Sequence, residues 1–226
     1  MTGQSPLPGG TGMGARSWVC LDIGEVLIDE SRVWKTWADV LGVTHLTLLA
    51  AMGAAIAAGG DHRQAFELLG IDDWVRHLER FEDSYGGFRR ADLYDDALPG
   101  LDALRARGFR VALAGNQPMR REGELAALGV AADVIVSSES LGAEKPAPDF
   151  FARVLHLIGD PQPEAVFYVG DRVDNDVDAA AASGLRPVWL RRGPWGALQR
   201  DTTGRAELVV SSLAELPSRL AALARL

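Results

Sequence analysis

The chain has 226 residues, of which 47% are hydrophobic, and a formal net charge of -8 at pH 7. This length accommodates one α/β domain and a small accessory domain. The acidic balance argues against a general binder of nucleic acid or anionic membranes. The sequence contains no run of about 18 apolar residues, so no membrane span is expected.

Residues 1–15 are rich in glycine, proline and serine and lack the apolar core of a secretory signal. We expect a flexible N-terminal tail on a cytoplasmic protein. Cys20 is the single cysteine of the chain. Its place within an apolar run predicts a small buried side chain rather than a reactive thiol.

The first predicted element is an apolar run that begins at Trp18, ends at Asp22 and passes directly into Gly24. Residues that favour β-structure, followed by a glycine turn, predict a buried strand with Asp22 at its C-terminal tip. Open α/β sheets bind their ligands at that end of the strands. Asp22 is therefore the first candidate functional residue.

Residues 31–94 have apolar positions at helical spacing, interrupted by glycines. This pattern predicts an all-helical insertion of roughly four helices. Trp34, Trp37 and Trp74 fall within it, and we expect them to pack between helices rather than to line a substrate site.

From residue 95 to the C-terminus, helical and strand patterns alternate. We expect helices over 99–107, 122–128, 149–158 and 176–183 and from about residue 213, and strands over 110–114, 134–136, 165–169, 186–190 and 207–210. Strands separated by helices of this length predict right-handed crossovers and a doubly wound parallel sheet. Residues 16–30 and 95–226 are thus expected to form one α/β core.

Polar residues follow several of these strands. Asn116 follows the strand that ends near Gly115, and Asp171 follows the strand over 165–169. Lys145, one of only two lysines, precedes Pro146 in a loop between elements. Because the carboxyl ends of parallel strands meet at one edge of the sheet, we expect Asp22, Asp171 and Lys145 to meet there.

Other charged residues near this edge receive a less specific interpretation. Arg120, Arg121 and Arg172 could attract a phosphate, but we expect a solvated face. The four histidines show no ligand spacing with other metal-binding residues. We assign them no chemistry.

In their order along the chain, these motifs resemble those of the haloacid dehalogenase superfamily of hydrolases. They are Asp22-Ile23-Gly24, Gly115-Asn116, Lys145-Pro146 and Gly170-Asp171 with the acidic loop through Asp174 to Asp176. The resemblance runs from Trp18 to the C-terminus. It implies a Rossmann-like α/β core and a helical cap over 31–94.

Phosphoryl transfer needs an in-line nucleophile, a metal ion and cations around the phosphate. Asp22 can attack phosphorus to give an aspartyl-phosphate, and the carboxylates of Asp22 and Asp171 can bind Mg²⁺. The resemblance further implies that the backbone carbonyl of Gly24 binds the same ion. Lys145 would neutralise charge at the reacting group.

The remaining motif residues have supporting roles in this scheme. Asp176 or Asp174 would hold Lys145 or a metal-bound water. Gly115 and Asn116 occupy the position of a substrate-contacting pair in the family.

Two glycines depart from the family pattern. Gly24 stands where many phosphatases of the family have a second aspartate, and the loss of a general acid typically costs a factor of about 10² to 10⁴. Gly115 replaces a Ser or Thr whose hydrogen bond to phosphate is worth about 1.5 to 3 kcal/mol. Glu25 is a candidate substitute acid, although a shift of one residue usually redirects a side chain.

We therefore expect a Mg²⁺-dependent phosphatase that acts on a small phosphorylated metabolite. One alternative is a catalytically weakened member that binds a phosphorylated ligand or a protein partner, which the two glycines favour. A haloacid dehalogenase is less favoured, because a metal-independent enzyme has no use for a metal carboxylate at Asp171. The sequence leaves the oligomeric state open.

Overall fold

The computed structural model describes residues 17–223, so the tail predicted over 1–15 lies outside the described residues. Six parallel strands form one sheet in the order β3-β2-β1-β4-β5-β6. They are β1 (Trp18–Leu21), β2 (Arg110–Gly115), β3 (Val134–Ser137), β4 (Val166–Gly170), β5 (Arg186–Leu190) and β6 (Leu208–Val210). The predicted doubly wound, Rossmann-like sheet is confirmed.

β1 and β4 are hydrogen-bonded neighbours at the point where the strand order changes direction. From β1 the chain adds β2 and β3 toward one edge of the sheet, and from β4 it adds β5 and β6 toward the other. A crevice at such a switch point is where open α/β sheets bind ligands. Asp22 directly follows β1 and Asp171 directly follows β4. The topology therefore brings these two carboxylates to the switch point from opposite halves of the sheet.

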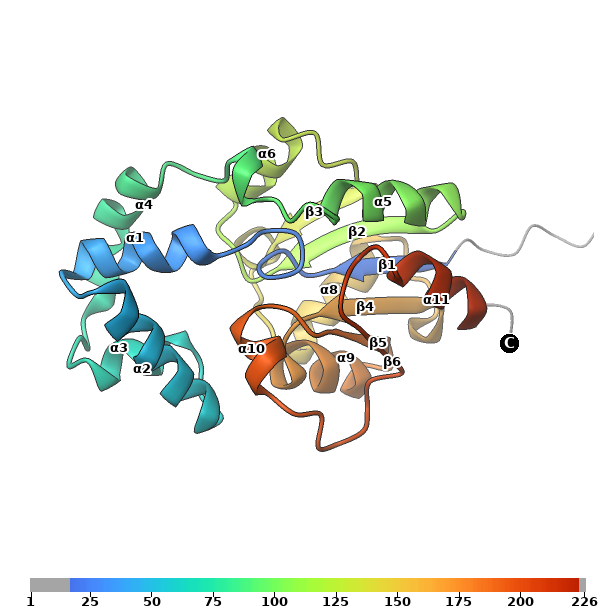
Figure 1. Ribbon diagram of the computed structural model, residues 1–226. Helices are drawn as coiled ribbons and strands as arrows, with labels where there is room; N and C mark the ends of the chain where they lie inside the picture. Colours follow the sequence, from blue (N-terminus) through green and yellow to red (C-terminus); the bar gives the residue numbers. More distant parts are fainter. Residues whose placement is uncertain (1–16, 224–226) are drawn as a thin grey trace, which may run out of the picture.

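Helices cover both faces of the sheet (Figure 1). They are α5 (Ala97–Ala106), α6 (Arg120–Ala127), α7 (Ser138–Leu141), α8 (Pro148–Leu157), α9 (Asp178–Ala182), α10 (Gly193–Leu198) and α11 (Leu216–Leu223). Val19 of β1 shares a hydrophobic cluster with Leu104 of α5 and Leu220 of α11. Cys20 points to the opposite face, where it lies with Phe150 of α8. Burial raises the pKa of Cys20 to about 12, which leaves the thiol unreactive.

The helix predicted over 176–183 has a different start. A π-helical turn over Val173–Val177 precedes α9. The backbone N–H of Val177 donates to the carbonyl of Arg172, five residues earlier, at 3.2 Å. This wider turn is of the kind found at functional sites, and it places the Asp176 side chain beside the end of β4.

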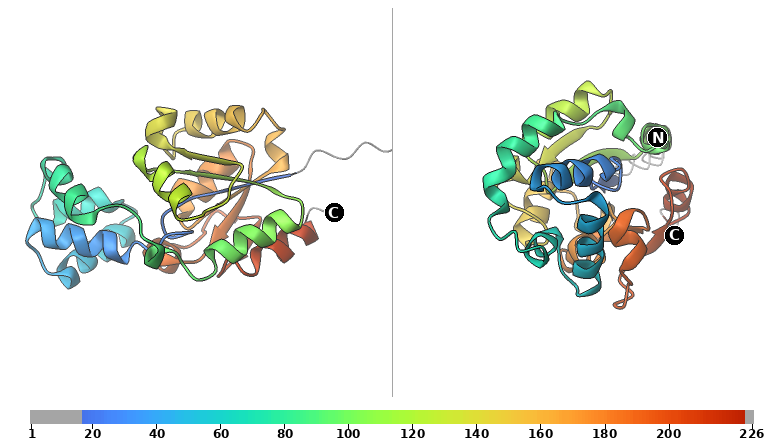
Figure 2. Two further views of the ribbon diagram at one scale, coloured as in Figure 1. Left: turned by 90° about the horizontal axis from the view of Figure 1, so that it is seen from above. Right: turned by 60° about the vertical axis from the view of Figure 1, so that its left-hand side comes forward.

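Residues 31–85 form a group of helices beyond one end of the sheet, which we call the helical segment (Figures 1 and 2). It contains α1 (Ser31–Leu41), α2 (His45–Ala57), α3 (His62–Leu68), a 3-10 helix (Trp74–His77) and α4 (Leu78–Tyr85). Trp37 stacks on Phe81 with ring centroids 4.3 Å apart and contacts Phe66 and Trp74. Aromatic packing thus forms the core of the segment.

Helix lengths also bear on membrane insertion. Among residues 17–223 no single helix is long and apolar enough to cross a membrane. The pair Ser31–Leu41 and His45–Ala57 passes by length and composition when taken together, but its two members are bent by 112°.

Two linkers join the helical segment to the sheet and are held to each other. The backbone N–H of Asp29 donates to the carbonyl of Asp92 at 2.7 Å. Arg32, in the first turn of α1, forms a bidentate pair with Asp92 and also donates to the carbonyls of Tyr85 and Gly87. Although burial opposes it, the Arg32 guanidinium lowers the pKa of Asp92. Arg32 therefore joins the two linkers to each other.

Candidate active site

Lys145 lies at the centre of a buried polar cluster at the C-terminal edge of the sheet. Its Nζ atom is 2.9 Å from Oδ2 of Asp22 and 2.6 Å from Oδ1 of Asp176, and its side chain is 0% exposed. Burial alone would lower the pKa of Lys145, but the two carboxylates hold it well above its usual value. The structure thus brings a permanent cation against Asp22.

Asn116 holds the backbone of Lys145 in place. Its Nδ2 donates to the carbonyl of Lys145 at 2.9 Å, and its Oδ1 accepts from the backbone N–H of Lys145 at 2.8 Å. Both ends of the amide are therefore used to position the lysine. The side chain also lines the adjacent cavity.

Asp171 is a buried acid that pairs with no cation of the described residues. Its exposure is 3%, and no hydrogen bond or ion pair within residues 17–223 reaches its carboxylate. Burial, together with repulsion from Asp176 and Asp22, raises the pKa of Asp171 well above its usual value. The indole N–H of Trp189 donates to the backbone carbonyl of Asp171 at 2.9 Å and so fixes the position of Asp171.

These carboxylates suit a divalent cation. One oxygen each from Asp22, Asp171 and Asp176 lies within 4.8 Å of the others. Hard carboxylate oxygens are the ligands of Mg²⁺, which usually takes one or two of them. Asp176 uses one carboxylate oxygen for Lys145 and the other for the backbone N–H of Arg172, whereas Asp22 contacts Lys145 through Oδ2. Asp22 and Asp171 are therefore the pair that fits a metal ion.

The structure separates the two residues that the sequence offered as partners of Lys145. Asp176 binds Lys145 and also accepts from the backbone N–H of Arg172 at 3.0 Å. Asp174 is 47% exposed and pairs with the Arg172 side chain at 2.6 Å. Although burial opposes it, this pairing lowers the pKa of Asp174. Asp174 therefore lies outside the cluster.

The Glu25 carboxylate accepts hydrogen bonds from residues of both linkers. Its Oε2 accepts from the hydroxyl of Tyr94 at 2.5 Å, and its Oε1 accepts from the backbone N–H of Glu30 at 3.2 Å. Burial raises the pKa of Glu25. Its backbone has φ 52, a left-handed conformation uncommon outside glycine, which turns the side chain toward Gly193.

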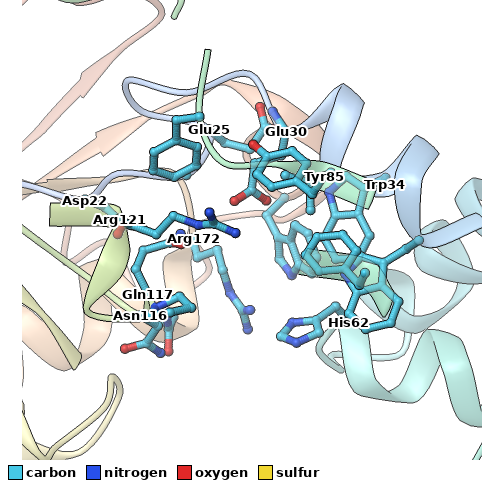
Figure 3. Close-up of a pocket in the computed structure, with 18 of the residues that line it drawn as sticks. Asp22, Glu25, Glu30, Trp34, His62, Tyr85, Asn116, Gln117, Arg121 and Arg172 are labelled. Atoms are coloured by element: carbon cyan, nitrogen blue, oxygen red, sulfur yellow. The ribbon is translucent and has the colours of Figure 1, made fainter. Parts of the chain in front are cut away.

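A cavity of about 280 Å³ lies between the cluster and the helical segment (Figure 3). The core contributes mainly polar side chains to its walls and the helical segment mainly aromatic ones. The lining includes Asp22, Asn116, Lys145, Asp171 and Arg172 from the core and Trp34, Trp37, His62, Phe66 and Trp74 from the helical segment. The tryptophans expected to pack between helices thus also form a wall of this cavity.

Two buried hydrogen-bond donors of the cavity lining lack a partner in the described part of the chain. They are the indole nitrogen of Trp195, on α10 of the core, and the hydroxyl of Tyr85. Buried polar groups normally find a partner. The lining can therefore donate hydrogen bonds to a bound molecule in addition to making apolar contacts.

The arginines of the cavity are neutralised by neighbouring carboxylates. The expectation of a solvated face is wrong for Arg121, whose side chain is only 4% exposed and pairs with Glu82 at 2.8 Å and Glu124 at 2.9 Å. Arg121 is buried because α6 packs its guanidinium over the Tyr85 ring. Arg172, 16% exposed, pairs with Asp174. Neither is free to bind a second anion strongly.

Sequence reasoning missed Glu30 and His62, which both line the cavity. Burial, with the charges of Glu25 and Asp22 nearby, raises the pKa of Glu30 to about 8. Burial among aromatic rings lowers the pKa of His62 to about 4. Glu30 directly precedes a helix, which made it resemble an ordinary helix cap, and His62 had no partner at ligand spacing.

The chain is similar in sequence and in fold to known proteins. A family model described as haloacid dehalogenase-like hydrolase matches residues 17–184. Glyceraldehyde 3-phosphate phosphatase of Methanopyrus kandleri is 32% identical over 146 residues, which are 61% of this chain and 62% of that protein. The match thus spans less than two thirds of that relative.

The chain also resembles a second phosphatase in sequence and a solved HAD phosphatase in fold. Phosphoserine phosphatase of Thermus thermophilus is 30% identical over 183 residues, which are 75% of this chain and 72% of that protein. The crystal structure of a HAD phosphatase from Thermococcus onnurineus superposes with a TM-score of 0.60 at 22% identity, covering 90% of this chain and 97% of that one. At that identity the likeness concerns the fold alone.

Proposed function

The chain belongs to the haloacid dehalogenase-like hydrolases, and on this premise we propose that it is a Mg²⁺-dependent phosphatase of a small phosphorylated metabolite. The observation that carries the proposal is the buried cluster, in which Lys145 pairs with Asp22 while no cation within residues 17–223 pairs with Asp171. A nucleophile, a fixed cation and carboxylates that can hold a divalent ion are what phosphoryl transfer requires. The phosphatase names of the relatives support the same reaction.

In the proposed reaction, a carboxylate oxygen of Asp22 attacks phosphorus, the bond to the ester oxygen breaks, and an aspartyl-phosphate forms. Water then attacks phosphorus, which releases inorganic phosphate and restores Asp22. Lys145 keeps its charge throughout and stabilises the negative charge that gathers beside Asp22. Asp22, Asp171 and the Gly24 carbonyl would hold Mg²⁺, which would neutralise charge on the phosphate.

The cavity favours a substrate whose remainder is small, uncharged and partly apolar. Its aromatic wall comes from the helical segment, and its arginines already have carboxylate partners. We propose that the helical segment acts as the cap that selects the substrate. The donors of Tyr85 and Trp195, which have no partner within residues 17–223, would bind oxygen atoms of that substrate.

Two observations favour a second candidate, a weakened member that binds a phosphorylated ligand without turnover. Gly24 lacks the usual acid, and Gly115 has no hydroxyl to offer a phosphate. This alternative shares the fold and the metal site with the first. It differs in turnover alone, so a kinetic measurement separates the two.

The test is phosphate release with and without Mg²⁺, on 4-nitrophenyl phosphate and a panel of sugar and nucleotide phosphates, with Asp22→Asn as the blank. Turnover that needs both Mg²⁺ and Asp22 is the expected result. Folded protein that binds Mg²⁺ and phosphate by calorimetry but releases none from any ester would favour the binding candidate and overturn the phosphatase.

A further inference from the structure

The space beside Gly24 is filled by another carboxyl group. A Cβ atom built on Gly24 would lie 2.3 Å from Oε1 of Glu30 and 2.9 Å from its carboxyl carbon. In an aspartate, the carboxyl oxygens lie roughly 2.4 Å from Cβ by standard bond lengths. The distance from this Cβ position to Oε1 of Glu30 therefore matches the distance from Cβ to a carboxyl oxygen in an aspartate at position 24.

The turn after β1 places Glu30 there. The backbone N–H of Glu25 donates to the carbonyl of Ile28 at 2.7 Å, so the chain folds back on itself between Gly24 and Ile28. Glu30 then occupies the N-cap position of α1, but its side chain makes no capping hydrogen bond. The carboxyl group returns to Gly24 instead of capping its own helix.

No ion pair within residues 17–223 reaches the Glu30 carboxyl, which lies beside the indole N–H of Trp34. It lines the same cavity as Asp22 (Figure 3). Glu25, the candidate that the sequence suggested, has both oxygens engaged by Tyr94 and the Glu30 backbone. Of the two glutamates, Glu30 is the one available to exchange a proton with a bound molecule.

We propose that Glu30 is the general acid and base of this site, in place of the aspartate absent at position 24. The inference rests on the proposed phosphatase function. In the first step, Glu30 gives its proton to the ester oxygen as the bond to phosphorus breaks, so that an alcohol leaves. In the second step, its carboxylate takes a proton from the attacking water as the bond between phosphorus and Asp22 breaks. The acid is thereby restored.

Glu30→Gln tests the first step with two esters of similar shape. Nitrophenolate departs from 4-nitrophenyl phosphate without a proton, whereas benzyl phosphate releases an alkoxide that needs one. We expect kcat/KM to fall by about 10² to 10⁴ on benzyl phosphate and by less than about tenfold on 4-nitrophenyl phosphate. Glu79→Gln, an exposed change on α4, controls for handling and should leave both values unchanged.

The second step gives a readout that does not depend on steady-state activity. Without a base to activate water, Glu30→Gln should accumulate aspartyl-phosphate during reaction with 4-nitrophenyl phosphate. We expect a burst of nitrophenolate equal to the enzyme concentration and a phosphorylated species in the intact-protein mass spectrum. The unaltered protein should show neither under the same conditions.

A relocated aspartate separates chemistry from structural support. Gly24→Asp alone would collide with Glu30, but combined with Glu30→Ala it places a carboxyl group in the vacated space. We expect this double variant to recover at least about tenfold in kcat/KM on benzyl phosphate over Glu30→Ala alone. A merely structural role for Glu30 would not be rescued in this ester-dependent way.

Three outcomes would overturn the inference. Equal losses on the two esters in Glu30→Gln would show that Glu30 gives up no proton to the leaving group. A selective loss of benzyl phosphate turnover in Glu25→Gln, with Glu30→Gln unaffected, would assign the acid to Glu25. No Asp22-dependent turnover of 4-nitrophenyl phosphate in the unaltered protein would overturn the phosphatase itself, and the assignment of Glu30 with it.

Discussion

The Nζ atom of Lys145 donates to Oδ1 of Asp176 at 2.6 Å, with side-chain exposures of 0% and 1%. Removing one member of a buried pair strands the other charge, which typically costs about 3 to 5 kcal/mol. Asp176 can reach Lys145 only because residue 170 is glycine: a Cβ atom there would lie 2.2 Å from the Asp176 carboxyl carbon. The pair therefore supports both the fold and the charge balance of the site.

Lys145→Met should lower the free energy of unfolding by about 3 to 5 kcal/mol and reduce kcat by at least about 10²-fold. Urea denaturation and phosphate release measure the two effects. Adding Asp176→Asn should return part of the stability, because it removes the stranded charge, but none of the activity. A double variant no more stable than Lys145→Met would contradict this account.

Mg²⁺ should raise the melting temperature through Asp171. A ligand at about 100 times its Kd stabilises the folded state by about 2.7 kcal/mol. Asp171→Asn should abolish the rise, and without metal it should be at least as stable as the unaltered protein, because it relieves carboxylate repulsion. Asp174→Asn, outside the cluster, is the matched control and should keep the rise. Equal Mg²⁺ responses in all three proteins would place the metal elsewhere.

His62 should make stability depend on pH. Its folded pKa of about 4 lies below its usual value of 6.5, so between these pH values the unfolded chain binds the proton and the folded chain does not. The contribution of the neutral His62 to the free energy of unfolding is therefore fully present above pH 6.5. It is lost as pH falls toward 4, which lowers the free energy of unfolding by at most about 3 kcal/mol. His62→Gln should flatten the difference between urea curves at pH 7 and pH 5. An equally large difference in His62→Gln and the unaltered protein would contradict this account.

Gly115→Ser should impair the enzyme even though it restores a hydroxyl typical of the family. A Cβ atom at position 115 would lie 2.4 Å from Oδ1 of Asp22, while Oδ2 of Asp22 is held by Lys145. Displacement of the nucleophile should outweigh one added hydrogen bond, with a loss of about tenfold or more in kcat/KM. Gly123→Ser, whose Cβ meets nothing within 4 Å, is the control. A gain in activity for Gly115→Ser would show that Asp22 has room to move.

Phosphate esters with a carboxylate should be poorer substrates than neutral ones. Arg121 and Arg172 already have carboxylate partners, and Glu25, Glu30 and Glu82 also line the cavity. 2-Phosphoglycolate and 2-hydroxyethyl phosphate differ in one group and form a matched pair. We expect kcat/KM to be at least about tenfold higher for the neutral ester, since like charges repel across a low-dielectric site. A preference for phosphoglycolate would contradict this reading of the arginines.

The sequence predicted the features that depend on local pattern. Strand periodicity, and polar residues that directly follow strands, placed Asp22 and Asp171 at one edge of a parallel sheet. It did not predict contacts that depend on how turns and helices pack. Arg121 is buried by Glu82, 39 residues away, and Glu30 reaches Gly24 only because the turn after β1 closes on Ile28.

Arg32 has a mechanical consequence for the helical segment. It joins the start of α1 to Asp92 of the second linker, so the two linkers are tied together where they leave the core. Glu30 precedes Arg32, and its backbone N–H donates to Glu25 of the turn after β1. A rotation of the helical segment beyond this tie would change access to the cavity and would leave Glu30 with the turn that carries Gly24.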